Sequence, residues 1–235
     1  MHWTAVDSVN VNLPDGIRLY SGRNDSLPLR AWYVTIDEKR PEIFSKVVVS
    51  DDPEDGRESV SSFAHDLGAT VVVNGGYFTM GQTPARHVGL LVSDGSLIST
   101  ATDSALRDSV WYVTARAAVG FSGMDEIDIS WAAVRNDTVF SLPAPPPNRS
   151  GNPTSRIDFS NAYIWKVRDA IGAGPTLIMD GKIRITSDEE VFFGSSIPKT
   201  HPRTAVGYTQ NGVLILMVVD GRQVVSRGVD LEELA

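Results

Sequence analysis

The chain has 235 residues, a net charge of −8 and 42% hydrophobic residues. These values exclude a disordered or fibrous chain, and the acidic excess argues against a general nucleic-acid binder, which usually carries a basic footprint. The sequence holds no cysteine, which excludes disulfides, thiolate metal sites and cysteine nucleophiles.

Nothing in the sequence predicts a membrane span. No apolar run approaches the ~20 residues that cross a bilayer. The first residues, Met1 to Thr4, lack the charged and apolar regions of an export signal, so we expect no signal peptide in this numbering.

Most of the apolar pattern has a period of two or forms short continuous runs, which predicts strands. In chain order the predicted strands are residues 17–21, 29–36, 43–50, 70–73, 89–93, 111–121, 127–132, 138–142, 163–167, 176–179 and 213–219. Asp94-Gly95, Asp180-Gly181 and Asn211-Gly212 each lie between apolar runs, and such pairs favour the positive φ angles of tight hairpins.

Two helices are predicted. The first has an apolar stripe from Val60 to Leu67, with Ser59 as its N-cap and Gly68 as its stop. The second begins after Asp230, which forms a capping-box pattern with Glu233. This helix reaches the end of the sequence within about one turn, too short to be stable alone, so we expect a piece of a longer protein.

These elements predict an α+β fold with a central, mostly antiparallel sheet and few helices. We expect one domain over residues 1–235. The segment 142–156 contains five prolines and is interpreted as a surface loop inserted into this domain.

The last hairpin places several charged residues near one another. If Asn211-Gly212 is a two-residue turn, Arg203 faces Asp220 and His201 faces Arg222, all on one face of the ribbon. Two guanidiniums and a histidine could bind an anion. The alternative is a cross-strand salt bridge that only closes the hairpin.

A second pattern is a buried strand that runs directly into Asn74-Gly75-Gly76. Two glycines let the backbone approach a ligand or turn sharply, and Asn74 could present its amide to a sugar or phosphate oxygen. The alternative is a tight turn followed by core aromatics.

Two sets of acidic residues are interpreted without a bound metal. The run 188–190 is interpreted as a solvated charge run. Asp180 and Asp220 could contribute oxygen ligands to calcium, but their spacing does not demand a metal, so we predict no metal site and no cofactor.

Five short motifs together resemble the phosphodiester glycosidase family, in the family's order, over about residues 17–235 with a poor match at 103–156. The motifs are Asn74-Gly75-Gly76-Tyr77-Phe78, Gly172-Ala173-Gly174-Pro175, Pro202-Arg203-Thr204-Ala205-Val206-Gly207, Asp220-Gly221-Arg222-Gln223 and Leu231-Glu232-Glu233-Leu234-Ala235. The family pattern continues with an Asn-Leu-Asp-Gly-Gly-Gly-Ser loop. We expect this sequence to stop before that loop, which would complete the pocket.

The resemblance implies a secreted or envelope-associated hydrolase that cleaves a sugar 1-phosphodiester in a phosphorylated glycan. We predict catalytic roles for Asp220, as base or as orienter of Arg203, and for Arg203; an Asp of the downstream loop is the rival carboxylate. Predicted substrate-binding residues are Asn74, Gly75, Gly76, His201, Thr204, Gly221, Arg222 and Ser226. The alternatives are a non-catalytic glycan-binding domain and an interaction domain of a surface protein.

Overall fold

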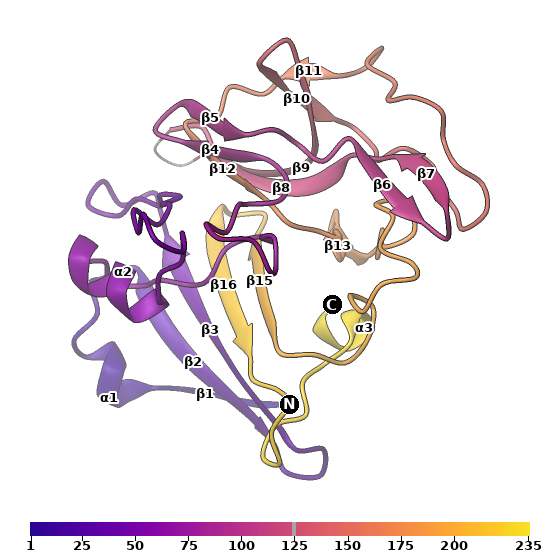
Figure 1. Cartoon of the computed structure of the whole chain (residues 1–235). Coiled ribbons are helices and arrows are strands. Elements are labelled where there is room, and N and C mark those ends of the chain that lie inside the picture. The colour runs from indigo at the N-terminus through magenta and orange to yellow at the C-terminus, as the bar shows by residue number, and fades with distance from the viewer. Residues whose placement is uncertain (124–125) are drawn as a thin grey trace.

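Two antiparallel sheets carry the fold of the computed structural model, which describes residues 1–123 and 126–235 (Figure 1). The five-stranded sheet has the order β1 (His2–Ala5), β2 (Ile17–Asn24), β3 (Leu29–Asp37), β16 (Val213–Val219) and β15 (Arg203–Tyr208). The seven-stranded sheet has the order β11 (Tyr163–Ile164), β10 (Thr138–Leu142), β9 (Ile127–Arg135), β8 (Arg116–Phe121), β12 (Asp169–Gly172), β4 (Leu91–Ser93) and β5 (Ser96–Ser99).

Two short hairpins and three helices complete the described chain. The hairpins are β6 (Ser104–Arg107) with β7 (Val110–Val113), and β13 (Ile178–Met179) with β14 (Lys182–Ile183). The helices are α1 (Asp7–Asn10), α2 (Val60–Leu67) and α3 (Leu231–Leu234). The prediction of a mostly antiparallel α+β fold with few helices is confirmed, with the strands divided between two sheets. No helix within 1–123 or 126–235 is long and apolar enough to cross a membrane.

Both predicted helices form with the predicted ends. Ser59 accepts a hydrogen bond from the backbone N–H of Ser62, and Gly68 is left-handed at the end of α2. Asp230 and Glu233 form a reciprocal capping box at α3. Capping residues satisfy backbone groups that the helix itself leaves free, which is why they could be identified from the sequence.

Two predicted strands are wrong. Residues 43–50 and 70–73 join no ladder in the structure. Ile43 and Val47 are nevertheless buried in the main core cluster, and Val71 packs against it. The apolar pattern in these segments therefore reports burial and not strand pairing.

The main core lies between the two sheets. Ile17, Ile36 and Leu214 of the five-stranded sheet pack with Leu91 and Val119 of the other sheet. We call the face that carries Ile17, Ile36 and Leu214 the inner face. Since residues two apart on a strand share a face, Trp32 is also on the inner face, about 13 Å along β3 from Ile36.

The proline-rich segment 142–156 follows β10 and is fastened by a buried asparagine. Asn148 is fully buried and donates to the carbonyls of Val113 and Glu189, while its Oδ1 accepts from the N–H of Thr154.

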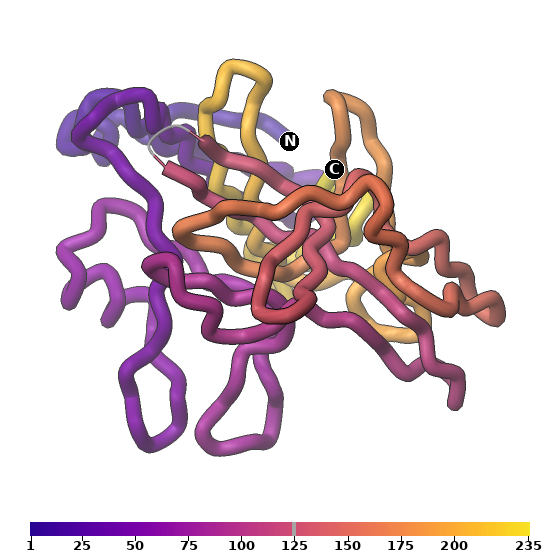
Figure 2. The backbone as a smooth tube through the Cα atoms, turned by 90° about the horizontal axis from the view of Figure 1, so that it is seen from above, coloured from indigo at the N-terminus to yellow at the C-terminus, as the bar shows by residue number. Residues whose placement is uncertain are grey.

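Figure 2 shows the same chain from above, and in both views the two chain ends lie near each other.

Candidate active site

A cavity of about 360 Å³ opens at the end of the inner face, away from the main core. The residues that line it come from three strands of the five-stranded sheet, from the ends of these strands and from the 70–76 segment. They are Trp32, Asn74, Pro202, Arg203, Thr204, Val218, Val219 and Asp220. Four residues predicted for the site, namely Asn74, Arg203, Thr204 and Asp220, therefore lie at one cavity.

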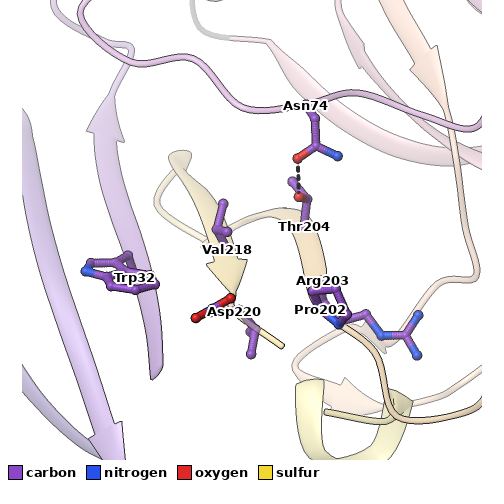
Figure 3. A pocket seen from close by; sticks show the side chains of 8 residues that line it. Trp32, Asn74, Pro202, Arg203, Thr204, Val218 and Asp220 are labelled. Atoms are coloured by element: carbon purple, nitrogen blue, oxygen red, sulfur yellow. Dashed lines mark hydrogen bonds between the residues drawn. The ribbon is translucent and has the colours of Figure 1, made fainter. Parts of the chain in front are cut away.

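One row of facing residues forms the floor of this cavity. Trp32 faces Val218 across β3 and β16, and Val218 faces Thr204 across β16 and β15. The Thr204 hydroxyl donates to Oδ1 of Asn74 at 2.5 Å, which ties the 70–76 segment to the sheet (Figure 3). The amide nitrogen of Asn74 makes no hydrogen bond within the described residues and remains available to a ligand.

The predicted register of the last hairpin is wrong by one residue. Thr209 and Val213 face each other around a loop of three residues, 210–212, and Arg203 faces Val219 instead of Asp220. Within the described chain, Gly212 is left-handed and Asn211 is not, which fits a type I turn followed by a left-handed glycine. A slip of one residue sends alternate side chains to the opposite face, so the predicted Arg203–Asp220 pair does not form.

Arg203 is instead bound to backbone carbonyls. Its guanidinium donates to Val229 at 3.2 Å and to Ile197 at 2.7 Å, with a further short contact to Lys199. Burial lowers the pKa of this guanidinium below its ordinary value. In Figure 3 it points away from the Asp220 carboxylate. In this arrangement Arg203 holds the segment that precedes β15 against the segment that precedes α3.

The Asp220 carboxylate lies on the inner face, at the cavity end of β16. Its Oδ1 accepts hydrogen bonds from the N–H of Gly221 at 2.8 Å and from the side chain of Gln223 at 3.4 Å. Among the described residues, no basic side chain forms an ion pair with it, and in Figure 3 its oxygens point toward Trp32. Asp220 is thus a half-buried carboxylate with Oδ2 free to meet a ligand or water.

Ser226 fixes the backbone of Asp220. The β3–β16 ladder continues past its last paired residues through a bond from Asp220 N–H to the Arg30 carbonyl at 3.0 Å. The Ser226 hydroxyl bridges the other two groups: it accepts from the Arg30 N–H at 3.0 Å and donates to the Asp220 carbonyl at 2.7 Å. Ser226 is fully buried, so in this structure it acts as a positioning residue behind the cavity.

Replacing Ser226 with alanine is expected to lower the free energy of unfolding by about 1–3 kcal/mol. The change leaves the Arg30 N–H and the Asp220 carbonyl without their shared partner in a partly buried place. Urea denaturation followed by circular dichroism measures the loss. Ser96→Ala, at an exposed residue of β5, is the control and should change little. Equal stability of the two variants would contradict the bridging role.

Of the other residues predicted to bind substrate, His201 and Arg222 contact each other, and Gly221 has a packing role. The guanidinium of Arg222 lies 3.2 Å from Nδ1 of His201, whose Nε2 lies 3.0 Å from the Ser196 carbonyl. These two residues therefore do meet, as predicted, but outside the ladder. A Cβ on Gly221 would lie 2.7 Å from the backbone nitrogen of Pro202, so this glycine permits close backbone packing.

Gly75 and Gly76 are also explained by packing within the protein. A Cβ on Gly75 would lie 2.5 Å from the Ile171 side chain, and one on Gly76 would overlap the Gly172 carbonyl. The glycines thus let the 70–76 segment cross β12 closely. This crossing carries the adjacent Asn74 to the cavity.

Behind this crossing lies a buried carboxylate that the sequence interpretation missed. Glu190 is fully buried, so the prediction of a solvated charge run at 188–190 is wrong for this residue. It accepts four hydrogen bonds, from Ala117 N–H, Thr176 N–H, Trp131 Nε1 and the Thr186 hydroxyl. Burial raises the pKa of Glu190, and the hydrogen bonds oppose that rise.

The Glu190 network connects the glycine motifs. Gly174 has a positive φ and sits so close to the Glu190 carboxylate that a Cβ would overlap it. The Tyr77 hydroxyl donates to the Gly174 carbonyl at 2.9 Å, and burial raises the pKa of Tyr77. The Asn-Gly-Gly-Tyr and Gly-Ala-Gly-Pro motifs therefore pack on each other and support Asn74.

The site offers a defined chemistry. A carboxylate, a primary amide and an indole surround a cavity with room for a small polar ligand, the combination expected where a few polar groups orient a substrate against an apolar wall. Within residues 1–123 and 126–235, no group of three or more His, Asp or Glu side chains is arranged to hold a metal ion.

Comparison with known proteins gives a family and a fold. The family model described as phosphodiester glycosidase matches residues 67–235. A search of curated protein sequences returned no match.

Three solved structures share the fold at low identity. The zebrafish N-acetylglucosamine-1-phosphodiester alpha-N-acetylglucosaminidase catalytic domain, auto-inhibited by its pro-peptide, is 23% identical with a TM-score of 0.57, over 99% of this chain and 69% of that one. A hypothetical protein from Synechocystis is 16% identical with a TM-score of 0.61, over 100% and 55% of the two chains. A putative exported protein from Burkholderia pseudomallei is 16% identical with a TM-score of 0.53, over 88% and 64%. This chain thus spans little more than half of the Synechocystis protein.

Proposed function

Because the chain belongs to the phosphodiester glycosidase family, we propose that it hydrolyses the bond between the anomeric carbon of a sugar and a phosphodiester. The observation that carries this proposal is the Asp220 carboxylate, which lies without an ionic partner among the described residues at a cavity lined by Trp32, Asn74 and Thr204.

The reaction requires few protein groups. Water adds to the anomeric carbon and passes a proton to Oδ2 of Asp220. The bond from that carbon to the phosphate oxygen breaks, and its electron pair stays on the oxygen. The products are the free sugar and a phosphomonoester. Glycosyl cleavage commonly uses two carboxylates, but the departing phosphomonoester is a weak base and leaves without strong acid assistance, so one carboxylate suffices.

Arg222 holds the phosphate in this proposal. It lies next to the Asp220-Gly221 corner and supplies the cationic donor, while His201 orients it: Nδ1 of His201 accepts from the Arg222 guanidinium at 3.2 Å, and Nε2 donates to the Ser196 carbonyl. Arg203 keeps the role of a positioning residue, because its guanidinium donates to the backbone carbonyls of three residues, Val229, Ile197 and Lys199. It is not the partner of Asp220, since the register places the two side chains on opposite faces of the sheet.

We further propose that the substrate is a phosphorylated glycan of the cell envelope or the extracellular space. The description of the Burkholderia neighbour as a putative exported protein supports this location. The name of the zebrafish neighbour makes N-acetylglucosamine the first sugar to test.

The test is a direct assay of sugar release. The protein is incubated with the methyl phosphodiester of N-acetylglucosamine 1-phosphate and with the corresponding esters of other hexoses, and free reducing sugar is measured. Methyl N-acetylglucosaminide, which lacks phosphate, is the control substrate. Release from a phosphodiester but not from the neutral glycoside supports the proposal. Tight binding by calorimetry without any release would instead support a non-catalytic glycan-binding domain.

A further inference from the structure

We propose that β3 supplies two substrate-binding side chains, Trp32 as a platform for the sugar ring and Arg30 as a ligand of the phosphate. This inference rests on the proposed function of the same cavity. Neither residue stands out in the sequence, because both belong to an ordinary alternating strand.

The sheet register places both residues on the inner face of β3: Trp32 lines the cavity, and the exposed Arg30 is the next residue along that face, beyond the lining. Arg30 faces Asp220 across β3 and β16, through the hydrogen bond from Asp220 N–H to the Arg30 carbonyl, and Trp32 faces Val218. Facing residues of an antiparallel pair share a face, so Arg30, Trp32 and Asp220 all lie on the inner face. β3 thus presents Trp32 at the cavity and Arg30 just beyond it, on the face that carries the Asp220 carboxylate.

The Trp32 side chain is suited to a sugar ring. It lines the cavity and remains 38% exposed, although it is a large apolar residue. An indole offers a flat apolar face of the kind against which the C–H groups of a sugar pack, and the Asp220 oxygens beside it can accept hydrogen bonds from the sugar hydroxyls.

The Arg30 side chain is suited to a phosphate. It is exposed, and its guanidinium makes no hydrogen bond or ion pair within the described residues, whereas Arg203 is occupied by carbonyls. Arg30 also faces Arg23 on β2, whose guanidinium is paired with Asp25, so within the described residues Arg30 is the arginine of this facing pair without an acidic partner. A bound phosphate would supply that partner and would receive a bidentate hydrogen bond.

The spacing of the two side chains fits one ligand. Residues two apart on a strand are about 7 Å apart, which is the scale of a hexose ring and the phosphate attached to its anomeric carbon. With the ring on Trp32 and the phosphate at Arg30, the bond to be cleaved lies beside Asp220.

The experiment measures binding of three probes by calorimetry: N-acetylglucosamine 1-phosphate, free N-acetylglucosamine and inorganic phosphate. Arg30→Ala should weaken the two phosphate-bearing probes by about 10- to 100-fold and leave the free sugar unchanged. Trp32→Ala should weaken the two sugar-bearing probes and leave phosphate unchanged. Arg30→Lys and Trp32→Phe should each recover part of the loss.

Two control variants separate local from general effects. Arg18→Ala replaces an arginine on the other face of the same sheet, and Trp111→Ala replaces a remote tryptophan that is 66% exposed. Neither should change the binding of any probe. Binding of all probes at wild-type strength in the Arg30 and Trp32 variants, an equal loss of all three probes, or no binding by the wild type would each overturn the proposal.

The sugar-release assay distinguishes this proposal from the proposed function. Selective binding without hydrolysis would retain the two subsites and refute the enzyme. Hydrolysis that both alanine variants catalyse like the wild type would retain the enzyme and refute the subsites.

Discussion

The Asp220→Asn variant is expected to release sugar about 10²- to 10⁴-fold more slowly than the wild type, the range that a positioned general base contributes. Asparagine keeps the oxygen that accepts the Gly221 N–H, so the local backbone is preserved. It removes the oxygen that would accept a proton from water. The measurement is the rate constant for sugar release at saturating substrate, together with a thermal melt.

The control for this variant is Asp180→Asn. Asp180 occupies a left-handed hairpin position between β13 and β14, which asparagine also adopts readily, so neither the melt nor the rate should change. A fully active Asp220→Asn enzyme would remove Asp220 from the reaction and require another carboxylate. A variant that is inactive but also unfolded would leave Ser226→Ala as the milder test of the same corner.

The Glu190→Ala variant is expected to lose about 3–5 kcal/mol of stability, more than any surface change. Four donors would lose their acceptor in a fully buried place, and each unsatisfied donor costs about 1–3 kcal/mol, with partial relaxation reducing the sum. Urea denaturation measures the shift in the free energy of unfolding.

Two further variants sharpen this result. Glu190→Gln keeps one acceptor oxygen but turns an amide N–H₂ toward a donor, so it should fall between wild type and alanine. Glu54→Ala removes an exposed carboxylate and should lie within about 0.5 kcal/mol of the wild type. If Glu190→Ala were as stable as Glu54→Ala, Glu190 would not organise the glycine motifs.

The sequence predicted those features that depend on local chemistry. The caps of α2 and α3 were identified because Ser59, Gly68 and Asp230 act on backbone groups within a few residues. The turns at Asp94-Gly95 and Asp180-Gly181 form as two-residue hairpins, with both residues of each pair at positive φ.

The site could be predicted only in part because one turn admits two geometries. Asn-Gly fits a two-residue turn, and it equally fits a three-residue loop in which only the glycine is left-handed. The second geometry occurs at 210–212, and it moved Arg203 to the opposite face from Asp220. Arg30 and Trp32 were missed for another reason: β3 and β16 are distant in sequence, so no turn fixes the register that sets their neighbours.

The burial of the Glu190 carboxylate could not be predicted from the sequence for a different reason. Glu190 lies in a run of three acidic residues, and most such runs are solvated. Its four donors come from Ala117, Trp131, Thr176 and Thr186, which are distant in sequence or separated by a turn. Because only folding brings these four donors together, no local sequence pattern could predict them.

The two ends of the inner face differ in how far their residues are constrained by packing. Ile17, Ile36 and Leu214 at one end pack between the sheets, whereas Asn74 and Pro202 at the other end line the cavity and are not part of that core cluster. Residues in such positions can change without loss of the packing between the sheets. The residues at the cavity can therefore vary while the architecture is retained, as expected for proteins that share a fold at 16–23% identity.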